Sequence, residues 1–371
     1  MIRALHIIDT GGPGGAETVF SQMVMHLDAS RFQSTVVVGG MGWLAGQLRL
    51  RGVTPHVLTA KGSFNVRYLL SVIRLARQCK CDVMVAHLYG SAVYASLAGM
   101  LLSIPVVAVL HGQTDVPSTE RLSTFKASVL RRGSRKVIFV SERLRDHLRH
   151  RLGLTDTQCA VIPNGVDTNV FQRSSDRSLR AELGLTEDTI LVGAIGNIRP
   201  PKAYEVLLRA ARLAVDRSQR LHFIIAGDGE NALGTKLIEL RHTLKLERHV
   251  TFLGLRSDVA RILNNLDAFV LSSRTEGFSI ACIEAMACGV PVVATRSGGP
   301  EQILADGAGL LIPTDDPRSL ADAIDRLTSS KTLAATLTAI ALERVQQKYS
   351  LEKMLSRYED LLTDVVGSSR H

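Results

Sequence analysis

Short β-rich runs alternate with longer amphipathic stretches along all 371 residues of the chain. This alternation is typical of parallel sheets whose connecting helices cover both faces. Because one ordinary core serves about 100–200 residues, the length predicts two such domains. The runs that we expect to form strands are, in the first set, Ile2–Ile8, Thr35–Val38, Val53–Leu58, Asp82–His87, Pro105–Leu110, Val137–Val140 and Ala160–Ile162, and, in the second, Ile190–Ile195, His222–Ala226, Val250–Leu253, Ala268–Leu271, Pro291–Ala294 and Leu310–Ile312.

A polar and charged stretch over residues 171–188 separates the two sets of strands. We therefore expect an N-terminal domain over residues 1–172 and a C-terminal domain over residues 173–371. The last amphipathic stretch, Leu351–Val365, could pack on either domain. Doubly wound sheets bind ligands at the carboxyl ends of their strands, so two such sheets facing one another would enclose a cleft.

Composition excludes several classes of protein. The 46% of hydrophobic and 21% of charged residues are typical of a soluble globular chain. The longest apolar stretch, Ala92–Leu110, is interrupted by polar residues and Pro105, which predicts a buried helix and strand and no transmembrane helix. The first residues lack the pattern of a signal peptide, so we expect a cytoplasmic protein. Five cysteines without paired spacing, and the absence of metal-binding motifs, predict no metal site and no cofactor.

A glycine-rich turn, Thr10–Glu17, follows the first predicted strand and opens a helix. The free N–H groups at Gly14 and Gly15 could face an anion there. The turn is not a dinucleotide fingerprint, because Glu17 stands where that pattern has glycine. A tight turn without a ligand is the alternative.

Two cations follow the first strand of the second domain. Arg199 and Lys202 lie in the proline-stiffened segment 196–202, just ahead of a predicted helix over Glu205–Val215. Arginine binds a diphosphate as a fork and lysine as a point charge, so the loop suits a diphosphate. A solvated basic loop is the alternative.

Two glutamates flank the start of another helix. Glu276 follows the strand Ala268–Leu271, and Glu284 lies in the apolar predicted helix Ala281–Ala287. Ser279 is expected to be its N-cap, with the N–H groups from Ile280 onward aimed at a phosphate. Two acids at this spacing can bond a ribose and a transferred sugar on either side of a diphosphate. For Glu284 the alternative is a buried ion pair with an arginine.

The run from Glu276-Gly277-Phe278 to Glu284 and on to Ala294 resembles the E-x7-E region of the group 1, or family 4, retaining glycosyltransferases. Further motifs occur in the order that the family shows: Gly14-Gly15-Ala16-Glu17, His111-Gly112, the segment 162–167, the segment 226–230, Phe252-Leu253-Gly254 and Ser297-Gly298-Gly299. The resemblance covers nearly the whole chain. It implies the GT-B fold, two doubly wound Rossmann-like domains facing across a cleft, and a nucleotide-sugar donor held mainly by the second domain without an obligate metal.

The resemblance also implies roles for single residues. It places His111, which ends a predicted strand, at the reacting sugar, and Lys202 at the donor diphosphate. Glu284 binds the ribose, and Gly14 and Gly15 approach the phosphate from the first domain. The sugar and phosphates contact Glu276 and the backbone of Phe278, Ser279 and Ile280.

One departure from the family concerns the diphosphate clamp. Asn197 stands where the family has arginine, and Ala203 stands where it has glycine. The expected substitute for the missing cation is Arg199, two positions after Asn197.

Two other functions remain open on the sequence. A GT-B sugar-nucleotide epimerase would share the fold and the donor but would need no acceptor. A nucleic-acid-binding protein is suggested by the net charge of +9, although no nucleic-acid-binding motif is present, and we expect no nucleic-acid partner.

Most of the positive charge lies between Arg121 and Arg151, where ten Lys and Arg residues face only Glu142 and Asp146. Leu122, Phe125, Val129 and Leu130 recur among these cations near helical spacing, as in a helix at a membrane surface. We expect docking on the inner face of an anionic membrane and a lipid-linked or polysaccharide acceptor. A solvated helix face is the alternative.

Overall fold

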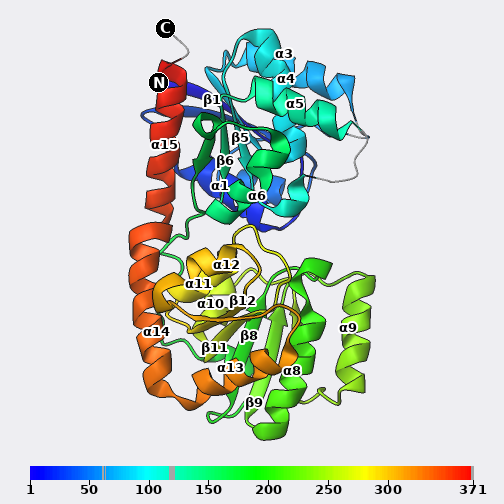
Figure 1. Ribbon diagram of the computed structural model, residues 1–371, viewed down its shortest axis with the longest axis vertical. Coiled ribbons are helices and arrows are strands. Elements are labelled where there is room, and N and C mark those ends of the chain that lie inside the picture. The colour runs from blue at the N-terminus through cyan, green and yellow to red at the C-terminus, as the bar shows by residue number, and fades with distance from the viewer. Residues whose placement is uncertain (61, 63, 117–121, 369–371) are drawn as a thin grey trace. The chain divides into compact units, whose positions relative to one another are not determined.

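The computed structural model describes residues 1–60, 62, 64–116 and 122–368 (Figure 1). Contacts divide the chain into two compact units: unit 1 contains Met1–Asn164 and the segment from Leu351 onward, and unit 2 contains Gly165–Ser350. The predicted boundary after residue 172 lies slightly beyond this division and stays a prediction.

Unit 1 is built on a seven-stranded parallel sheet with the order β3-β2-β1-β4-β5-β6-β7. Strands β4 and β5 are buried along their whole length, as expected where helices cover both faces of a sheet. The strands are β1 (Ile2–Ile8), β2 (Phe32–Val38), β3 (His56–Val57), β4 (Val83–His87), β5 (Val106–Leu110), β6 (Lys136–Phe139) and β7 (Cys159–Val161). The helices are α1 (Gly15–His26), α2 (Trp43–Leu50), α3 (Val66–Gln78), α4 (Tyr89–Leu102), α5 (Ser123–Gly133), α6 (Glu142–Leu152) and α15 (Leu351–Gly367), with 3₁₀ turns η1 (Gln113–Asp115) and η2 (Asp156–Gln158).

The last helix, α15, belongs to unit 1, where it packs against α1 and β4. Leu351, Met354, Leu355, Tyr358 and Leu362 recur at helical spacing and are buried, which places one apolar stripe of the helix in the core. On its outer side Glu359 pairs with Arg31 at 2.9 Å and accepts the N–H of Asp28.

Unit 2 is built on a six-stranded parallel sheet with the order β10-β9-β8-β11-β12-β13. Its strands are β8 (Ile190–Ile195), β9 (Leu221–Ala226), β10 (Val250–Gly254), β11 (Ala268–Leu271), β12 (Val292–Thr295) and β13 (Leu310–Ile312). Its helices are α7 (Ser178–Glu182), α8 (Tyr204–Arg217), α9 (Ala232–Thr243), α10 (Val259–Asn264), α11 (Ile280–Ala287), α12 (Gly299–Ile303), α13 (Pro317–Ser329) and α14 (Lys331–Arg344), with 3₁₀ turns η3 (Pro200–Lys202) and η4 (Ala305–Gly307) and a π turn η5 (Val345–Tyr349).

Each sheet has one point where the strand order reverses. In unit 1 the reversal lies between β1 and β4, and in unit 2 between β8 and β11. The loops that leave two neighbouring strands diverge to opposite faces there, so a crevice opens at the carboxyl ends of those strands. These two reversal points are therefore where ligand-binding residues are expected.

All thirteen predicted strands are present, and four of them have the predicted bounds: Ile2–Ile8, Ile190–Ile195, Ala268–Leu271 and Leu310–Ile312. The stretch 171–188, predicted as a linker, contains α7 and packs on unit 2. There Glu182 pairs with Arg256 and Arg261, and Arg180 pairs with Asp267. Its high charge reflects this ion-pair cluster.

Candidate active site

The strand reversal in unit 2 brings together two loops that are distant in sequence. β8 is followed by the segment 196–203, and the neighbouring strand β11 is followed by Ser272 to Ser279. The Oγ of Ser272 donates to the carbonyl of Lys202 at 2.9 Å, and the N–H of Arg274 donates to the carbonyl of Pro201 at 2.7 Å. These bonds hold the two loops against each other.

Lys202 and Glu276 meet at this junction. The Nζ of Lys202 lies 2.7 Å from Oε1 of Glu276, and the same oxygen accepts a hydrogen bond of 2.6 Å from the Oγ of Ser273. The two charged side chains are 24% and 9% exposed. A largely buried ion pair with an additional hydroxyl donor is fixed in geometry, because either charge alone would be costly to leave unpaired.

The backbone before Lys202 has a conformation that its sequence explains. Gly196 has φ 151°, and a Cβ on Gly227 in the neighbouring loop would lie 2.1 Å from the carbonyl oxygen of Gly196. Only glycine fits at both positions. Ala203, where the family has glycine, takes the left-handed conformation with φ 49°, so the departure there keeps the turn at a cost in strain.

Asn197 links the loops after β8 and β9: its side-chain oxygen accepts the N–H of Asp228 at 3.2 Å. Its amide therefore has a structural use that an arginine at this position would not have. Arg199 is exposed, and within the described residues its guanidinium has no hydrogen-bond or ion-pair partner. It is thus available to a ligand, although a role in the diphosphate clamp stays a prediction.

The loop after β11 leads into α11 through close backbone contacts. Glu276 bonds through its N–H to the carbonyl of Ser297 at 2.8 Å and through its carbonyl to the N–H of Gly299 at 3.0 Å. A Cβ on Gly299 would lie 2.7 Å from the Cα of Phe278. The Ser297-Gly298-Gly299 motif therefore supports the loop that carries Glu276, because no side chain fits between the two segments.

Ser279 is the residue before α11, as predicted for the N-cap. Its side chain makes no capping hydrogen bond, and its buried Oγ has no partner among the described residues. The first N–H groups of a helix, here from Ile280 onward, have no intrahelical acceptor. A buried hydroxyl and these N–H groups therefore remain for an anion. Phe278 packs against Tyr349, with ring centroids 5.5 Å apart.

The side chain of Glu284 is partly exposed on α11, and its neighbours Ile283 and Ala285 are buried. Burial raises the pKa of its carboxyl from 4.5 to about 7. No arginine or lysine of the described residues pairs with it, so the predicted alternative of a buried ion pair has no support. An uncompensated carboxyl in an apolar helix destabilises the fold, as is common at ligand-binding sites.

The strand reversal in unit 1 is lined by acids. α1 begins at Gly15 with Gly14 as N-cap, and a Cβ on Gly14 would lie 2.4 Å from a carboxylate oxygen of Glu17. The Glu17 carboxylate thus lies over the N-terminus of α1, where we had expected an anion. Asp9 follows β1 and is partly buried, and the loss of solvent around its carboxyl raises its pKa. The predicted phosphate contact of Gly14 and Gly15 stays untested.

His111 directly follows β5, at the same carboxyl edge of the unit 1 sheet. Its ring nitrogen Nε2 lies 2.9 Å from Nδ1 of His87, and burial lowers the pKa of His111 to about 4. Asp115 accepts the backbone N–H groups of His111 and Gly112 at 2.7 and 2.9 Å. Burial and the nearby charges of Asp9 and Glu17 raise the pKa of Asp115 to about 6.

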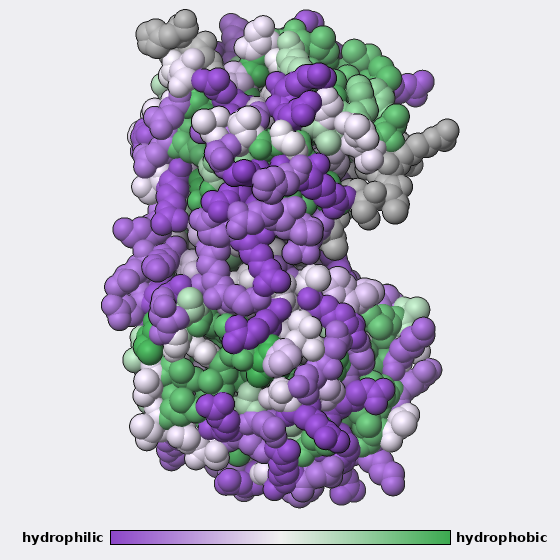
Figure 2. All heavy atoms as spheres, in the orientation of Figure 1, coloured by the Kyte–Doolittle hydropathy of each residue, from purple (hydrophilic) through white to green (hydrophobic). Residues whose placement is uncertain are grey.

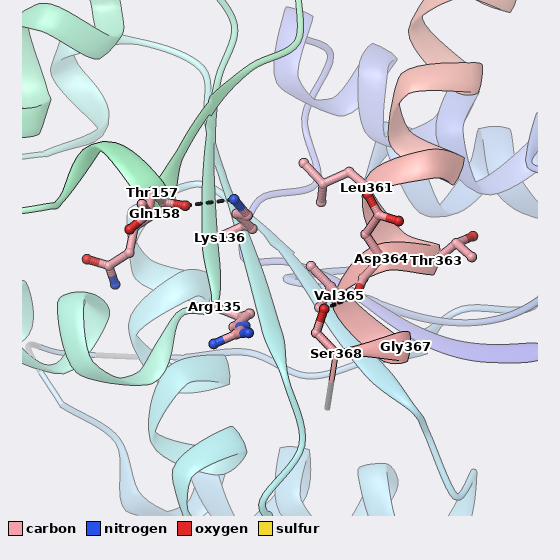
Figure 3. Close-up of a pocket in the computed structure, with 10 residues that line it drawn as sticks. All are labelled: Arg135, Lys136, Thr157, Gln158, Leu361, Thr363, Asp364, Val365, Gly367 and Ser368. Carbon is pink, nitrogen blue, oxygen red and sulfur yellow. Dashed lines mark hydrogen bonds between the residues drawn. The ribbon is translucent and has the colours of Figure 1, made fainter. Parts of the chain in front are cut away.

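A cavity of about 950 Å³ lies at the opposite, amino edge of the unit 1 sheet (Figure 3). Arg135 and Lys136 reach it from the start of β6, and Lys136 donates to the carbonyl of Thr157 at 2.7 Å. The remaining lining comes from Thr157, Gln158 and the last turns of α15. None of the predicted site residues lines this cavity.

Part of the basic region differs from the expected membrane helix. Leu122, which precedes α5, and Phe125 in its first turn are each 49% exposed, but Val129 and Leu130 of α5 are buried in the core. The expectation that all four face a membrane is therefore wrong, because α5 needs Val129 and Leu130 to pack on unit 1. Arg145 pairs with Glu142 and Asp146, and Arg149 with Asp156. Arg121 lies outside the described residues.

No helix in the described part of the chain is long and apolar enough to cross a membrane. Within the same residues, no group of three or more His, Cys, Asp or Glu side chains could hold a metal ion. The cysteines of the chain are free thiols.

Comparison with known proteins identifies both parts of the chain. The model of the family "Glycosyl transferases group 1" matches residues 175–344, and the model of "Glycosyltransferase Family 4" matches residues 13–170. The chain is a group 1, family 4 glycosyltransferase. It therefore belongs to the enzymes that use nucleotide-sugar donors.

Relatives of this family 4 glycosyltransferase include the N-acetyl-alpha-D-glucosaminyl L-malate synthase of Bacillus anthracis, 29% identical over 80% of this chain and 78% of that protein. The UDP-Gal:alpha-D-GlcNAc-diphosphoundecaprenol alpha-1,3-galactosyltransferase of Escherichia coli is 24% identical over 81% of this chain and 80% of that protein. The crystal structure of Anabaena HepE in complex with UDP-glucose matches with a TM-score of 0.88 at 24% identity, over 98% of this chain and 100% of HepE. The glycosyltransferase thus has the GT-B fold.

Proposed function

We propose that this glycosyltransferase moves a hexose from a UDP-sugar, with retention of configuration, onto a lipid-linked or polysaccharide acceptor. The observation that carries the proposal is the unit 2 junction, where Lys202, Glu276 and the start of α11 converge beside an unpaired, partly buried Glu284. HepE has been crystallised with UDP-glucose, and the Escherichia coli relative is named for a UDP-galactose donor and a diphosphoundecaprenol acceptor. Both names agree in class with the donor and acceptor that we propose.

The donor would lie across this junction. Lys202, held in place by Glu276, offers its charge to the diphosphate, and the N–H groups of α11 add partial positive charge on the other side. Glu284 accepts hydrogen bonds from the ribose hydroxyls, and Glu276 accepts them from the transferred sugar. Arg199 supplies the second cation in place of the family's arginine.

The reaction separates charge as the bond between the anomeric carbon and the diphosphate breaks. Negative charge develops on the leaving diphosphate, and fixed cations and N–H groups stabilise it without reorganising. The ion pair of Lys202 and Glu276 holds the lysine in position before the donor arrives. His111 of unit 1 would meet the reacting sugar, and no metal is required.

Docking on an anionic membrane surface, at the inner face of the membrane, is the second part of the proposal. Exposed apolar side chains gather on three neighbouring helices, α3, α4 and α5, and Figure 2 shows hydrophobic surface over this part of unit 1. They are Val66, Leu70, Met100, Leu101 and Phe125, together with Leu122 just before α5. Exposed cations such as Arg67, Arg131 and Arg132 lie on the same helices. An apolar surface edged by cations suits an anionic membrane, because each Lys or Arg near the membrane surface adds about 1 kcal/mol to the binding free energy.

The activity test uses the full chain, a panel of nucleotide sugars and acceptor lipid extracted from membranes. We expect one UDP-sugar to yield UDP and a glycosylated lipid, and Glu276→Gln to lose most of this turnover. Asp325→Asn, which removes an equally short ion pair with Arg217 at an exposed site, should leave it unchanged. Formation of a new free sugar nucleotide without nucleoside diphosphate would instead identify an epimerase.

Sedimentation with vesicles tests the membrane claim separately. We expect binding to anionic but not to neutral vesicles, and loss of binding when Arg131, Arg132, Arg135 and Lys136 are changed to Glu. Leu122→Ser with Phe125→Ser should weaken binding while keeping its dependence on anionic lipid. Equal binding by all variants would leave a soluble acceptor and remove the membrane claim.

A further inference from the structure

Two cysteines of unit 1 meet in the turn that joins α3 to β4. Cys79 is the residue after α3, and Cys81 lies two positions before the first residue of β4. Lys80 between them takes the left-handed conformation with φ 48°, and its N–H donates to the carbonyl of Arg77 at 3.2 Å. The N–H of Cys81 donates to the carbonyl of Ala76, also at 3.2 Å. These are the two bonds of a Schellman motif, so the turn that carries both thiols is fixed.

The side chains of the two cysteines are in contact. The thiol of Cys81 shares a hydrogen bond with that of Cys79, and the side chain of Thr35 on β2 bonds to Cys79 as well. The Cα atoms of residues two positions apart are separated by at most about 7 Å, and the turn at Lys80 shortens this separation. A disulfide spans about 4.4–6.8 Å between Cα atoms, so the two sulfurs can be joined without a large movement of the backbone.

The two thiols differ in charge and in access. The pKa of Cys79 is lowered to about 6, chiefly because Cys81 and then Thr35 donate hydrogen bonds to its thiolate, while burial opposes them. The same hydrogen bond, together with burial, raises the pKa of Cys81. The guanidinium of Arg3 on β1 is near both sulfurs, although it also pairs with Asp82 at 3.0 Å. Cys79 is partly exposed and Cys81 is buried, so the reactive thiolate is the accessible one of the two.

We propose that Cys79 and Cys81 are a reversible oxidation site, at which a low-molecular-weight disulfide converts the two thiols into a disulfide between them. The partly exposed thiolate of Cys79 is the nucleophile, and the buried thiol of Cys81 is the resolving group. An accessible thiolate beside a second thiol is the arrangement that redox-sensitive cysteines commonly have. The inference depends on neither the donor nor the acceptor of the transferase.

The reaction consists of two thiol–disulfide exchanges, here written with glutathione disulfide. The Cys79 thiolate attacks one sulfur of the reagent, so a bond forms between these two sulfurs while the bond within the reagent breaks and one glutathione thiolate leaves. Cys81 then loses its proton and attacks the sulfur of Cys79, which forms the protein disulfide and releases the second glutathione thiolate. The protein dithiol loses two electrons and two protons, and glutathione disulfide gains them to become two thiols.

The short separation in sequence explains why the oxidation is reversible. A disulfide stabilises a protein mainly by closing a loop, and a loop this short offers little such stabilisation. Strained or exposed disulfides have higher reduction potentials and are the ones most easily reduced. The bond fastens the end of α3 to the start of β4, at the amino edge of the unit 1 sheet. Because the predicted donor contacts follow the carboxyl ends of strands, oxidation should leave donor binding unchanged.

Peptide mapping of the full chain tests the proposal. The reduced protein is equilibrated near neutral pH with several ratios of glutathione to glutathione disulfide, quenched by alkylation and digested with trypsin. Trypsin cuts after Lys80, between the two cysteines, so the peptides on either side stay together only if a disulfide joins them. We expect the joined pair, in an amount that follows the glutathione ratio and that dithiothreitol abolishes. Absence of the joined pair at every ratio would overturn the proposal.

Matched serine substitutions separate the two roles. In Cys81→Ser the reaction should stop with glutathione on Cys79, and in Cys79→Ser the buried Cys81 should stay reduced. Cys159→Ser is the control and should leave the joined pair unchanged. Cys159 is also partly exposed in unit 1, but burial raises the pKa of its thiol. Glutathione on Cys159 as rapidly as on Cys79 would show that exposure alone decides the reaction, and would contradict the assignment of Cys79 as the nucleophile.

The alkylation rate of the reduced protein reports on the hydrogen bond between the thiols. With iodoacetamide at neutral pH, Cys79 should react at least about tenfold faster than Cys159, since the thiolate is the nucleophile. Cys81→Ala, which removes the hydrogen-bond donor, should slow Cys79, and Cys81→Ser, which keeps a hydroxyl donor, should not. Equal rates at Cys79 in the wild type and Cys81→Ala would contradict activation by Cys81. Should Cys81→Ala fail to fold, the wild-type peptide map and the Cys81→Ser variant still decide the proposal.

Discussion

The substitution Glu284→Gln should stabilise the protein while weakening donor binding. In the folded chain burial raises the pKa of Glu284 from 4.5 to about 7, which corresponds to about 3 kcal/mol of differential stability. Because the side chain is partly exposed, solvent reduces this, and about 2 kcal/mol is a reasonable expectation. Glutamine has nearly the same shape and avoids the cost of burying a charge.

The sign of the pH dependence follows from proton binding. Between about pH 4.5 and pH 7 the folded protein holds the Glu284 proton and the unfolded chain does not, so wild-type stability falls as the pH rises through this window. Glu284→Gln has no carboxyl at this position, so its stability does not fall for this reason. We therefore expect equal stability at pH 4.5 and a rise in Tm of about 4–8 °C for Glu284→Gln at pH 8, measured by scanning calorimetry.

Donor binding should change in the opposite direction. A carboxylate that accepts ribose hydroxyls makes hydrogen bonds worth about 1.5–3 kcal/mol, so the variant should bind UDP-glucose at least about tenfold more weakly at pH 8. Glu239→Gln, on the exposed side of α9, is the matched control and should change neither quantity. A loss of stability in Glu284→Gln would contradict the reasoning on burial, and unchanged donor affinity would remove Glu284 from the site.

Three further perturbations have defined outcomes. Arg199→Ala should weaken donor binding by about 1.5–3 kcal/mol in calorimetric titration, and an unchanged affinity would place the second cation elsewhere. Lowering the pH from 6.5 to 4 should destabilise unit 1, because His6 and His111, whose pKa values are lowered to about 4, stay neutral in the folded protein while the same residues bind protons in the unfolded chain. His6→Gln should remove part of this acid sensitivity, although Asp115, with a raised pKa, acts in the opposite direction. EDTA should leave turnover intact, and loss that Mg²⁺ restores would contradict a metal-free site.

The fold could be predicted because apolar residues recur with a different spacing in a strand and in a helix. Runs such as Ile190–Ile195 are short, apolar and followed by glycine, and the chain orders them as two parallel sheets. The helix after Ser279 was also predictable, because its cap and apolar pattern are local. Segment 171–188 was harder to predict, because its charges suggested a linker. In the structure Glu182 pairs with Arg256 and Arg261, and Arg180 pairs with Asp267. These partners are 70 or more positions away in sequence.

Side-chain partners in the candidate site were harder to predict. Lys202 and Glu276 were each expected at the donor, but their mutual ion pair depends on β8 and β11 being neighbours, which only the strand order reveals. Glu17 over the start of α1 had a local signal, because it stands three residues after the N-cap, the spacing of a capping box. No local signal in the sequence pointed to Ser273 or His87, because their contacts form only when the ends of neighbouring strands come together.

The most direct test of the account is a calorimetric titration of the full chain with UDP-glucose and other nucleotide sugars. The account predicts that at least one UDP-sugar binds, that Lys202→Ala weakens this binding at least about tenfold, and that Asp325→Asn leaves it unchanged. Binding of no nucleotide sugar, or equal binding by wild type and Lys202→Ala, would contradict the claim that the donor lies at the unit 2 junction.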